Sequence, residues 1–160
     1  MNDFKWRLED ESFKYLMPNE FKLTSKLIKQ KREEREIATK RMISQIEERL
    51  STENISVSVS GRPKHLFSVH NKLQRYKQLG RNFSDIEDLI AIRIIVKDTK
   101  ECYLVLGIIH ELWRPVTGSF DDYISSPKDN FYQSLHTVVI NEQSQKIEFQ
   151  IRTDTMHLYA

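Results

Sequence analysis

The stretch Gly61-Arg62-Pro63-Lys64-His65-Leu66-Phe67-Ser68 separates a helical N-terminal part of the sequence from a part that is rich in predicted strands. Proline is favoured at the first position of a helix, so Pro63 predicts that a helix begins directly after the turn. A helix N-terminus carries unpaired N–H groups and partial positive charge, and the cations Arg62 and Lys64 and the hydroxyl of Ser68 lie near it. These groups predict either a phosphate-binding corner or an ordinary basic turn.

On the N-terminal side of this stretch the sequence predicts a long helical segment. Apolar residues from Glu20 to Leu50 recur at steps of three and four residues, which is the period of an amphipathic helix. The run Lys29–Glu36 interrupts them, and its opposite charges stand four residues apart, as on an exposed helix face. Residues 4–17 form a shorter apolar segment before a proline. We therefore interpret residues 1–50 as a helical lead-in segment, whose charged face is either solvated or contacts a partner.

On the C-terminal side, strand patterns alternate with helix patterns. The run Leu89–Val96 is apolar on both faces except at Arg93, which predicts a central strand covered by helices. An arginine inside such a strand is costly unless it meets an anion, so Arg93 predicts either a structural ion pair or a ligand contact. Further strands are expected at Ile55–Val59, Ser134–Ile140 and Ile147–Arg152, and helices at residues 63–80 and at Thr99–Trp113. The sequence therefore predicts an α+β fold in which residues 51–160 form one compact unit.

The strand Ile147–Arg152 has the clearest alternation in the chain. Its apolar residues are expected to enter the core, while Glu148, Gln150 and Arg152 project from the other face, which is either solvated or a site. Asp88 directly precedes the predicted central strand, so neighbouring strands would bring two carboxylates together. A divalent cation that also binds phosphates would relieve their repulsion, and one carboxylate could accept a proton from an attacking hydroxyl. The alternative is two unrelated surface acids.

The overall composition limits the classes of function. The chain has 160 residues, of which 30% are charged and 39% hydrophobic, and its net charge is +2. This length suits one domain, and so small a charge does not support a broad nucleic-acid-binding surface. The single cysteine, Cys102, lies in an apolar run, the five histidines lack metal-ligand spacing, and no apolar stretch reaches the roughly 18 residues of a membrane span. We expect a cytoplasmic protein without direct nucleic-acid or membrane contacts and without a zinc site.

Five short motifs follow one another along the chain. They are Gly61–His65, Asp88–Arg93, Asp122–Ile124 with Pro127-Lys128, Tyr132–Thr137, and Glu148–Thr153 with Met156-His157. Their order and spacing resemble the synthetase domain of the RelA/SpoT family, and residues 8–50 resemble the helical segment that precedes it. The resemblance implies a nucleotidyltransferase-like fold, with a mixed sheet of about five strands flanked by helices. It also implies transfer of pyrophosphate from ATP to the 3′-hydroxyl of GDP or GTP, which yields (p)ppGpp.

The resemblance also implies roles for individual residues. ATP would contact Arg62, Lys64, Ser68, Lys72 and Arg93. The acceptor GDP or GTP would contact Lys128, Asn130, Tyr132, His136, Gln150 and Arg152, with Tyr132 stacking on guanine. Asp88 and Glu148 would be catalytic and would hold Mg²⁺, with Glu148 also the base for the 3′-hydroxyl.

The chain departs from the family pattern at several points. Phe131 stands where a small residue often precedes the stacking tyrosine, and Asp121-Asp122 follows the acidic pattern of synthesis-only members. The chain ends at Ala160, where the family usually continues, so we expect an excised domain that contacts hydrolase or regulatory domains in a parent protein. The His-Asp motif that hydrolysis needs does not occur in this sequence, so we expect no hydrolase activity.

Two alternatives to a synthetase stay open at this point. The first is a nucleotide-binding, regulatory module of a larger alarmone synthetase that no longer turns over. The second is a nucleotidyltransferase acting on RNA ends, which the net charge of +2 disfavours.

Overall fold

The computed structural model describes residues 2–61, 66–80 and 90–160, which contain five helices and six strands. The helices are α1 (Asn2–Leu16), α2 (Pro18–Thr52), α3 (Leu66–Gln78), α4 (Thr99–Leu112) and α5 (Asp154–Leu158). The strands are β1 (Ser58–Gly61), β2 (Ile90–Val96), β3 (Arg114–Pro115), β4 (Asp121–Asp122), β5 (Leu135–Ile140) and β6 (Lys146–Thr153).

The strands form one mixed sheet in the order β1-β2-β6-β5-β3, and β4 also pairs with β5. Among the strands of the described residues, β2 and β6 pair in parallel and the other pairs are antiparallel. The α+β class and the flanking helices are confirmed, with β3 and β4 as two-residue additions to the larger strands. We expected the strand that follows Asp88 to lie next to the strand that carries Glu148. The structure confirms this, because Ala91 in β2 pairs with Glu148 in β6.

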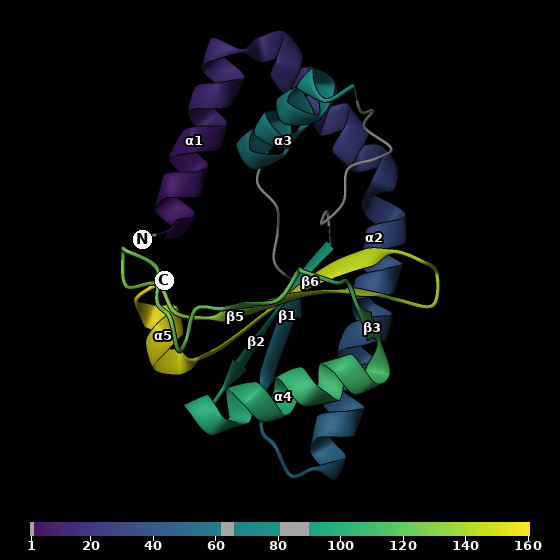
Figure 1. Ribbon diagram of the computed structural model, residues 1–160. Coiled ribbons are helices and arrows are strands. Elements are labelled where there is room, and N and C mark those ends of the chain that lie inside the picture. Colours follow the sequence, from purple (N-terminus) through teal and green to yellow (C-terminus); the bar gives the residue numbers. More distant parts are fainter. Residues whose placement is uncertain (1, 62–65, 81–89) are drawn as a thin grey trace.

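The main core lies on one face of this sheet. Ile92 of β2 and Phe149 of β6 are fully buried there, and α4 covers this face (Figure 1). The ring of Trp113 stacks on Phe149 with 5.7 Å between centroids. The C-terminal half of α2 adds Met42 and Leu50 to the same core. Burial of each such side chain stabilises the fold by about 1.5–3 kcal/mol, so this layer holds β6 firmly in place.

Helices α1 and α3 lie on the side of the sheet opposite α4, and the long helix α2 extends past both layers (Figure 1). Phe13 of α1 is buried against Phe67 and His70 of α3, with ring centroids 5.7 Å and 4.6 Å away. In the first turn of α3, the N–H of Phe67 donates to Asp10 Oδ1 at 3.0 Å. The N-terminal helices therefore pack on one another through an apolar cluster and a side-chain cap.

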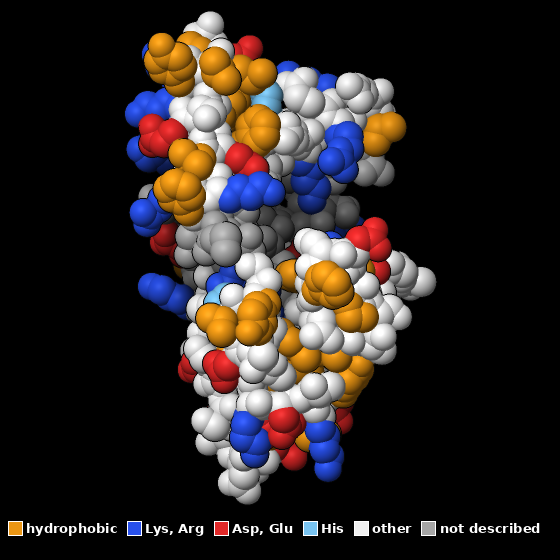
Figure 2. All heavy atoms as spheres, turned by 90° about the vertical axis from the view of Figure 1, so that its left-hand side faces the viewer, with side chains coloured by type: hydrophobic (Ala, Val, Ile, Leu, Met, Phe, Trp, Pro, Cys, Tyr) orange, Lys and Arg blue, Asp and Glu red, His pale blue; other side chains and the backbone are white. Residues whose placement is uncertain are grey.

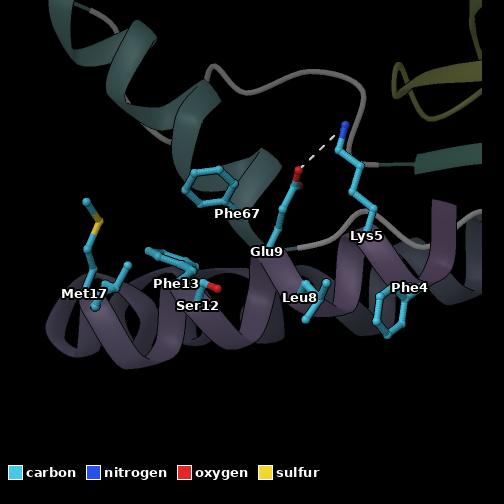
Figure 3. A pocket seen from close by; sticks show the side chains of 9 residues that line it. Phe4, Lys5, Leu8, Glu9, Ser12, Phe13, Met17 and Phe67 are labelled. Atoms are coloured by element: carbon cyan, nitrogen blue, oxygen red, sulfur yellow. Dashed lines mark ion pairs between the residues drawn. The ribbon is translucent and has the colours of Figure 1, made fainter. Parts of the chain in front are cut away.

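The outer side of α1 is apolar as well. Phe4, Leu8 and Leu16 are exposed, and orange side chains gather over this part of the surface in Figure 2. Together with Phe67 they line a pocket of about 570 Å³, beside which Lys5 and Glu9 form an ion pair at 4.0 Å (Figure 3). No helix of the described residues is long and apolar enough to cross a membrane.

One predicted strand begins later than its sequence pattern indicates. The alternation at Ile55–Val59 predicts a strand there, but β1 starts at Ser58. The N–H of Ile55 still donates to the carbonyl of Leu50 at 3.0 Å, so the chain is leaving α2 at this point. Ile55 and Val57 nevertheless pack against the core, which explains the apolar alternation outside the ladder.

Candidate active site

The pairing register places polar residues of five neighbouring strands in one row on the face opposite the core. Directly paired residues project to the same face of a sheet. From one edge to the other, the row contains Ser60, Arg93, Gln150, His136 and Asp121. Arg93 and His136 therefore lie on either side of Gln150. This arrangement is expected if Glu148, Gln150 and Arg152 of β6 form a site rather than a core layer.

Along β6, three side chains on this face are joined by hydrogen bonds. The Gln150 amide donates from Nε2 to Glu148 Oε1 at 2.7 Å, and its Oε1 accepts from Arg152 Nη2 at 3.3 Å. Gln150 and Arg152 are each only 3% exposed, whereas Glu148 is half-buried. The solvated-face alternative is therefore wrong for this strand, and Gln150 links the carboxylate to the guanidinium through both ends of its amide.

An aromatic and cationic cluster lies beside this ladder. The Tyr132 hydroxyl is 2.8 Å from His136 Nε2, and the Tyr123 ring meets the His136 ring edge-on at 5.3 Å. Lys128 Nζ lies 4.5 Å from the Tyr123 centroid and 5.3 Å from that of Tyr132, while Arg152 Cζ lies 5.7 Å from the Tyr132 centroid. Cations at these distances are attracted by the ring faces. The cluster combines a flat aromatic surface with two positive charges, which suits a nucleotide base and its phosphates.

The loop that carries Tyr123 is fastened to α4. Asp122 Oδ2 accepts from the Tyr103 hydroxyl at 2.8 Å, and its Oδ1 accepts from the backbone N–H groups of Ile124 and Ser125 at 3.0 and 2.9 Å. Desolvation alone would raise the pKa of Asp122, but hydrogen bonds from Ser125, Tyr103 and Ile124 outweigh it and lower this pKa. Sequence reasoning assigned no role to Tyr103 or Tyr123, and Tyr103, on the exposed face of a helix, gave no signal.

The turn before Tyr132 is closed by three hydrogen bonds. The N–H of Phe131 donates to Lys128 O at 2.8 Å, and that of Lys128 donates to Tyr132 O at 3.2 Å. Asn130 Oδ1 accepts from the N–H of Tyr132 at 3.2 Å, so this predicted nucleotide ligand also shapes the turn.

The residues predicted to contact ATP come from different parts of the chain. Arg93 lies in the sheet row, and Ser68 and Lys72 lie in α3, which is on the same side of the sheet as this row (Figure 1). Arg62, Lys64 and Asp88 lie outside the described residues.

Glu148 is compatible with the predicted magnesium ion. Mg²⁺ is commonly bound by one or two carboxylates together with substrate phosphates, and Glu148 is a half-buried carboxylate beside the cationic cluster. Within the described ranges, no group of three or more His, Cys, Asp or Glu residues could hold a metal by itself. As a half-buried carboxylate beside a cationic cluster, Glu148 fits an ion that shares its ligands with a nucleotide.

Comparison with known sequences gives consistent similarities. The chain is 39% identical over 157 residues to a GTP pyrophosphokinase of Escherichia coli (strain K12), covering 98% of this chain and 21% of that protein. It is 42% identical over 158 residues to a probable guanosine-3′,5′-bis(diphosphate) 3′-pyrophosphohydrolase of Synechocystis, covering 98% and 20%. The chain thus spans about a fifth of the length of these relatives.

Solved structures share the fold. The small alarmone synthetase 2 of Bacillus subtilis matches with a TM-score of 0.62 at 26% identity, covering 78% of this chain and 71% of that one. The small alarmone synthetase 1 of the same organism, bound to its product pppGpp, matches with a TM-score of 0.58 at 21% identity, with the same coverage. A family model described as the region found in RelA/SpoT proteins matches residues 61–160. With this match across more than half of its length, the chain belongs to the RelA/SpoT family.

Proposed function

We propose that this chain transfers the pyrophosphoryl group of ATP to the 3′-hydroxyl of GDP or GTP, giving AMP and (p)ppGpp. The observation that carries the proposal is the ladder from Glu148 through Gln150 to Arg152, which places a carboxylate next to the aromatic and cationic cluster. The pyrophosphokinase name of the Escherichia coli relative and the pppGpp bound to the Bacillus subtilis synthetase support the same reaction class.

The acceptor nucleotide would occupy the aromatic and cationic cluster. Guanine would stack on Tyr132, whose hydroxyl is held by His136 at 2.8 Å. Lys128 and Arg152, whose cationic groups lie 5.3 Å and 5.7 Å from the centroid of this ring, would neutralise the phosphates of the acceptor. Base–aromatic stacking contributes about 1–3 kcal/mol per base, so Tyr132 is the main anchor in this arrangement.

Glu148 would act on the 3′-hydroxyl. The attacking oxygen would bond to the β-phosphorus of ATP, the bond from that phosphorus to the bridging oxygen of the α-phosphate would break, and AMP would leave. Glu148 would take the hydroxyl proton as general base, a role that contributes typically 10²–10⁴-fold to rate. The amide of Gln150, 2.7 Å from Oε1, would fix the orientation of the carboxylate.

On the ATP side, Arg93 in the sheet row and Ser68 and Lys72 in α3 would contact the donor, together with Arg62 and Lys64. Mg²⁺ held by Glu148 and Asp88 would neutralise charge on the transferred phosphates. We further propose that the chain contacts other domains of a longer protein, because it spans about a fifth of the length of its relatives. We also propose that it works in the cytoplasm.

The direct test is product analysis with purified chain, ATP, Mg²⁺ and GDP or GTP. We expect AMP and ppGpp or pppGpp in equal amounts, and the ratio of the two rates gives the acceptor preference. The control acceptor is 3′-deoxy-GDP, which lacks the attacking hydroxyl and should give neither product. Nucleotide binding without AMP release would contradict the synthetase and support the regulatory, non-catalytic module instead.

The pyrophosphohydrolase name of the Synechocystis relative makes a second reaction testable on the same preparation. We propose that this chain does not hydrolyse ppGpp, since the His-Asp metal motif of hydrolysis is missing from its sequence. The expected result with ppGpp and Mn²⁺ is no release of pyrophosphate above the protein-free rate, and measurable release would refute the proposal.

A further inference from the structure

Phe131 has an unusual combination of backbone conformation and exposure. Its φ is 65°, in the left-handed region, and its side chain is 86% exposed. Among the described residues, the other non-glycine residues with positive φ are Asn54 and Ser144. Asparagine tolerates this region and serine is small, whereas a bulky residue there is an outlier. Phe131 therefore adopts a backbone conformation that disfavours bulky residues, and burial of its ring does not offset this strain.

The surrounding turn imposes this conformation. The N–H of Phe131 donates to Lys128 O at 2.8 Å, and the turn is closed again by the bond from the N–H of Lys128 to Tyr132 O at 3.2 Å. Strained residues persist where the surroundings over-determine them, and they cluster at ligand-binding sites. Glycine would satisfy the same hydrogen bonds without strain, so the shape of the turn does not explain the phenylalanine ring.

The position of the turn indicates what the ring contacts. Phe131 directly precedes Tyr132, and the turn also carries Lys128, whose ammonium lies 5.3 Å from the Tyr132 centroid. Both neighbours belong to the aromatic and cationic cluster, so Phe131 belongs to a turn that supplies part of the proposed acceptor site. An aromatic ring gains most from a flat partner with a π-face, which a nucleotide base supplies.

We propose that Phe131 is a second aromatic contact for the acceptor guanine nucleotide and sets its affinity. The inference rests on the proposed function, because it places GDP or GTP in the cluster of Tyr132, Lys128 and Arg152. A protein partner that uses the same exposed ring is the competing explanation, and the experiment below separates the two.

The test compares four variants with the wild-type chain. Phe131→Gly removes both ring and strain, Phe131→Asn removes the ring but keeps a side chain that tolerates positive φ, and Phe131→Tyr keeps the ring. Ser144→Gly is the matched control, because Ser144 has φ 61°, is exposed, and lies in the turn at the other end of β5. The measurements are the melting temperature, kcat, and the KM values for GDP, GTP and ATP.

We expect Phe131→Gly and Phe131→Asn to raise the KM for GDP and GTP at least about fivefold, since loss of base stacking corresponds to roughly 5- to 150-fold. The KM for ATP should stay within twofold, and Phe131→Tyr should retain the wild-type values. Phe131→Gly and Ser144→Gly should both raise the melting temperature, by about 2–4 °C for each kcal/mol of strain removed, with only the former affecting KM.

A KM for GDP within twofold of wild type in Phe131→Gly and Phe131→Asn would overturn the inference and leave the proposed function intact. A wild-type chain that lacks turnover but binds GDP allows the same comparison by calorimetric Kd values. A wild-type chain that neither turns over nor binds GDP contradicts the proposed function and this inference together.

Discussion

At the residue scale, the side chain that organises the site is Gln150, which carries no ionisable group. It is 3% exposed, and both ends of its amide are used within the protein, toward Glu148 and Arg152. The resemblance implies that Gln150 contacts the guanine nucleotide, and that role stays a prediction. Its hydrogen bonds support a positioning role, in which it holds the proposed base and a proposed acceptor-binding cation at a fixed separation.

Replacement of Gln150 tests this positioning role. Gln150→Met keeps the length of the side chain but removes both hydrogen bonds, and hydrogen bonds to charged groups contribute about 1.5–3 kcal/mol. We expect kcat to fall by roughly 10- to 150-fold, while the KM for ATP changes little because the two side-chain hydrogen bonds of Gln150 run to Glu148 and Arg152 and not to a predicted ATP ligand. Steady-state kinetics measures kcat and the KM for ATP separately, and substitution of an exposed residue, Gln143→Met, is the control. An unchanged kcat would contradict the positioning role.

At the same scale, Asp122 gives the fold a pH dependence. Desolvation works against the charged form, but hydrogen bonds from Ser125, Tyr103 and Ile124 lower its pKa from the ordinary value of 3.8. The unfolded chain therefore binds a proton at higher pH than the folded chain does. The ionised carboxylate stabilises the fold above pH 3.8, and this contribution is lost as the pH falls through the lowered pKa.

Asp122→Asn should therefore lower the free energy of unfolding at pH 7, and the difference from wild type should shrink below pH 3.8. Urea unfolding between pH 3 and pH 7 measures the difference, and exposed Asp129→Asn controls for loss of a negative charge. A difference that is constant across this range would show that ionisation of Asp122 plays no part.

At the element scale, β6 serves the core and the site at once. Its apolar residues are fully buried against α4, and its polar residues carry the ladder on the other face. The sequence predicts this arrangement well, because a period of two is local and decides which face each side chain takes. The sequence could not predict the bond from Tyr103 to Asp122, because it depends on how α4 lies against a loop 19 residues away.

Phe149→Ala tests how much the buried face of β6 contributes to the stability of the fold. Phe149 is fully buried and stacked on Trp113, so truncation removes apolar contacts and leaves a cavity. We expect the free energy of unfolding to fall by about 3–5 kcal/mol. Denaturant unfolding measures the loss, and Phe120→Ala, whose ring is 44% exposed, should cost much less. Equal losses in the two variants would contradict the proposed core layer.

At the scale of the whole molecule, α2 connects the N-terminal helices to the sheet. Its N-terminal half packs on α3 through Leu27 and Ile28, and its C-terminal half contributes Met42 and Leu50 to the main core. The division at residue 50 follows a change in sequence pattern, from the helical period to strand alternation. Sequence reasoning could not locate the core relative to that change, because the core depends on long-range packing of α2 against β1 and β2.

Two deletions test the division at residue 50. Removal of residues 1–50 takes Met42, Ile46 and Leu50 out of the core, and burial of three such side chains contributes about 5–9 kcal/mol. That is comparable with the total stability of a domain, so we expect no cooperative unfolding transition. Removal of residues 1–16 deletes only α1, and a transition should remain. A cooperative transition for residues 51–160 alone would support the division predicted from the sequence.

The most direct test of the proposed pyrophosphoryl transfer is the turnover of Glu148→Gln beside wild type, with ATP, Mg²⁺ and GDP or GTP. The substituted amide can still accept the hydrogen bond from Gln150, but it cannot take the 3′-hydroxyl proton. We predict that wild type forms (p)ppGpp and AMP, and that kcat in the variant falls by about 10²–10⁴-fold while GDP binding stays within a few-fold. Turnover by the variant within tenfold of wild type would contradict the assignment of Glu148 and, with it, the proposed mechanism.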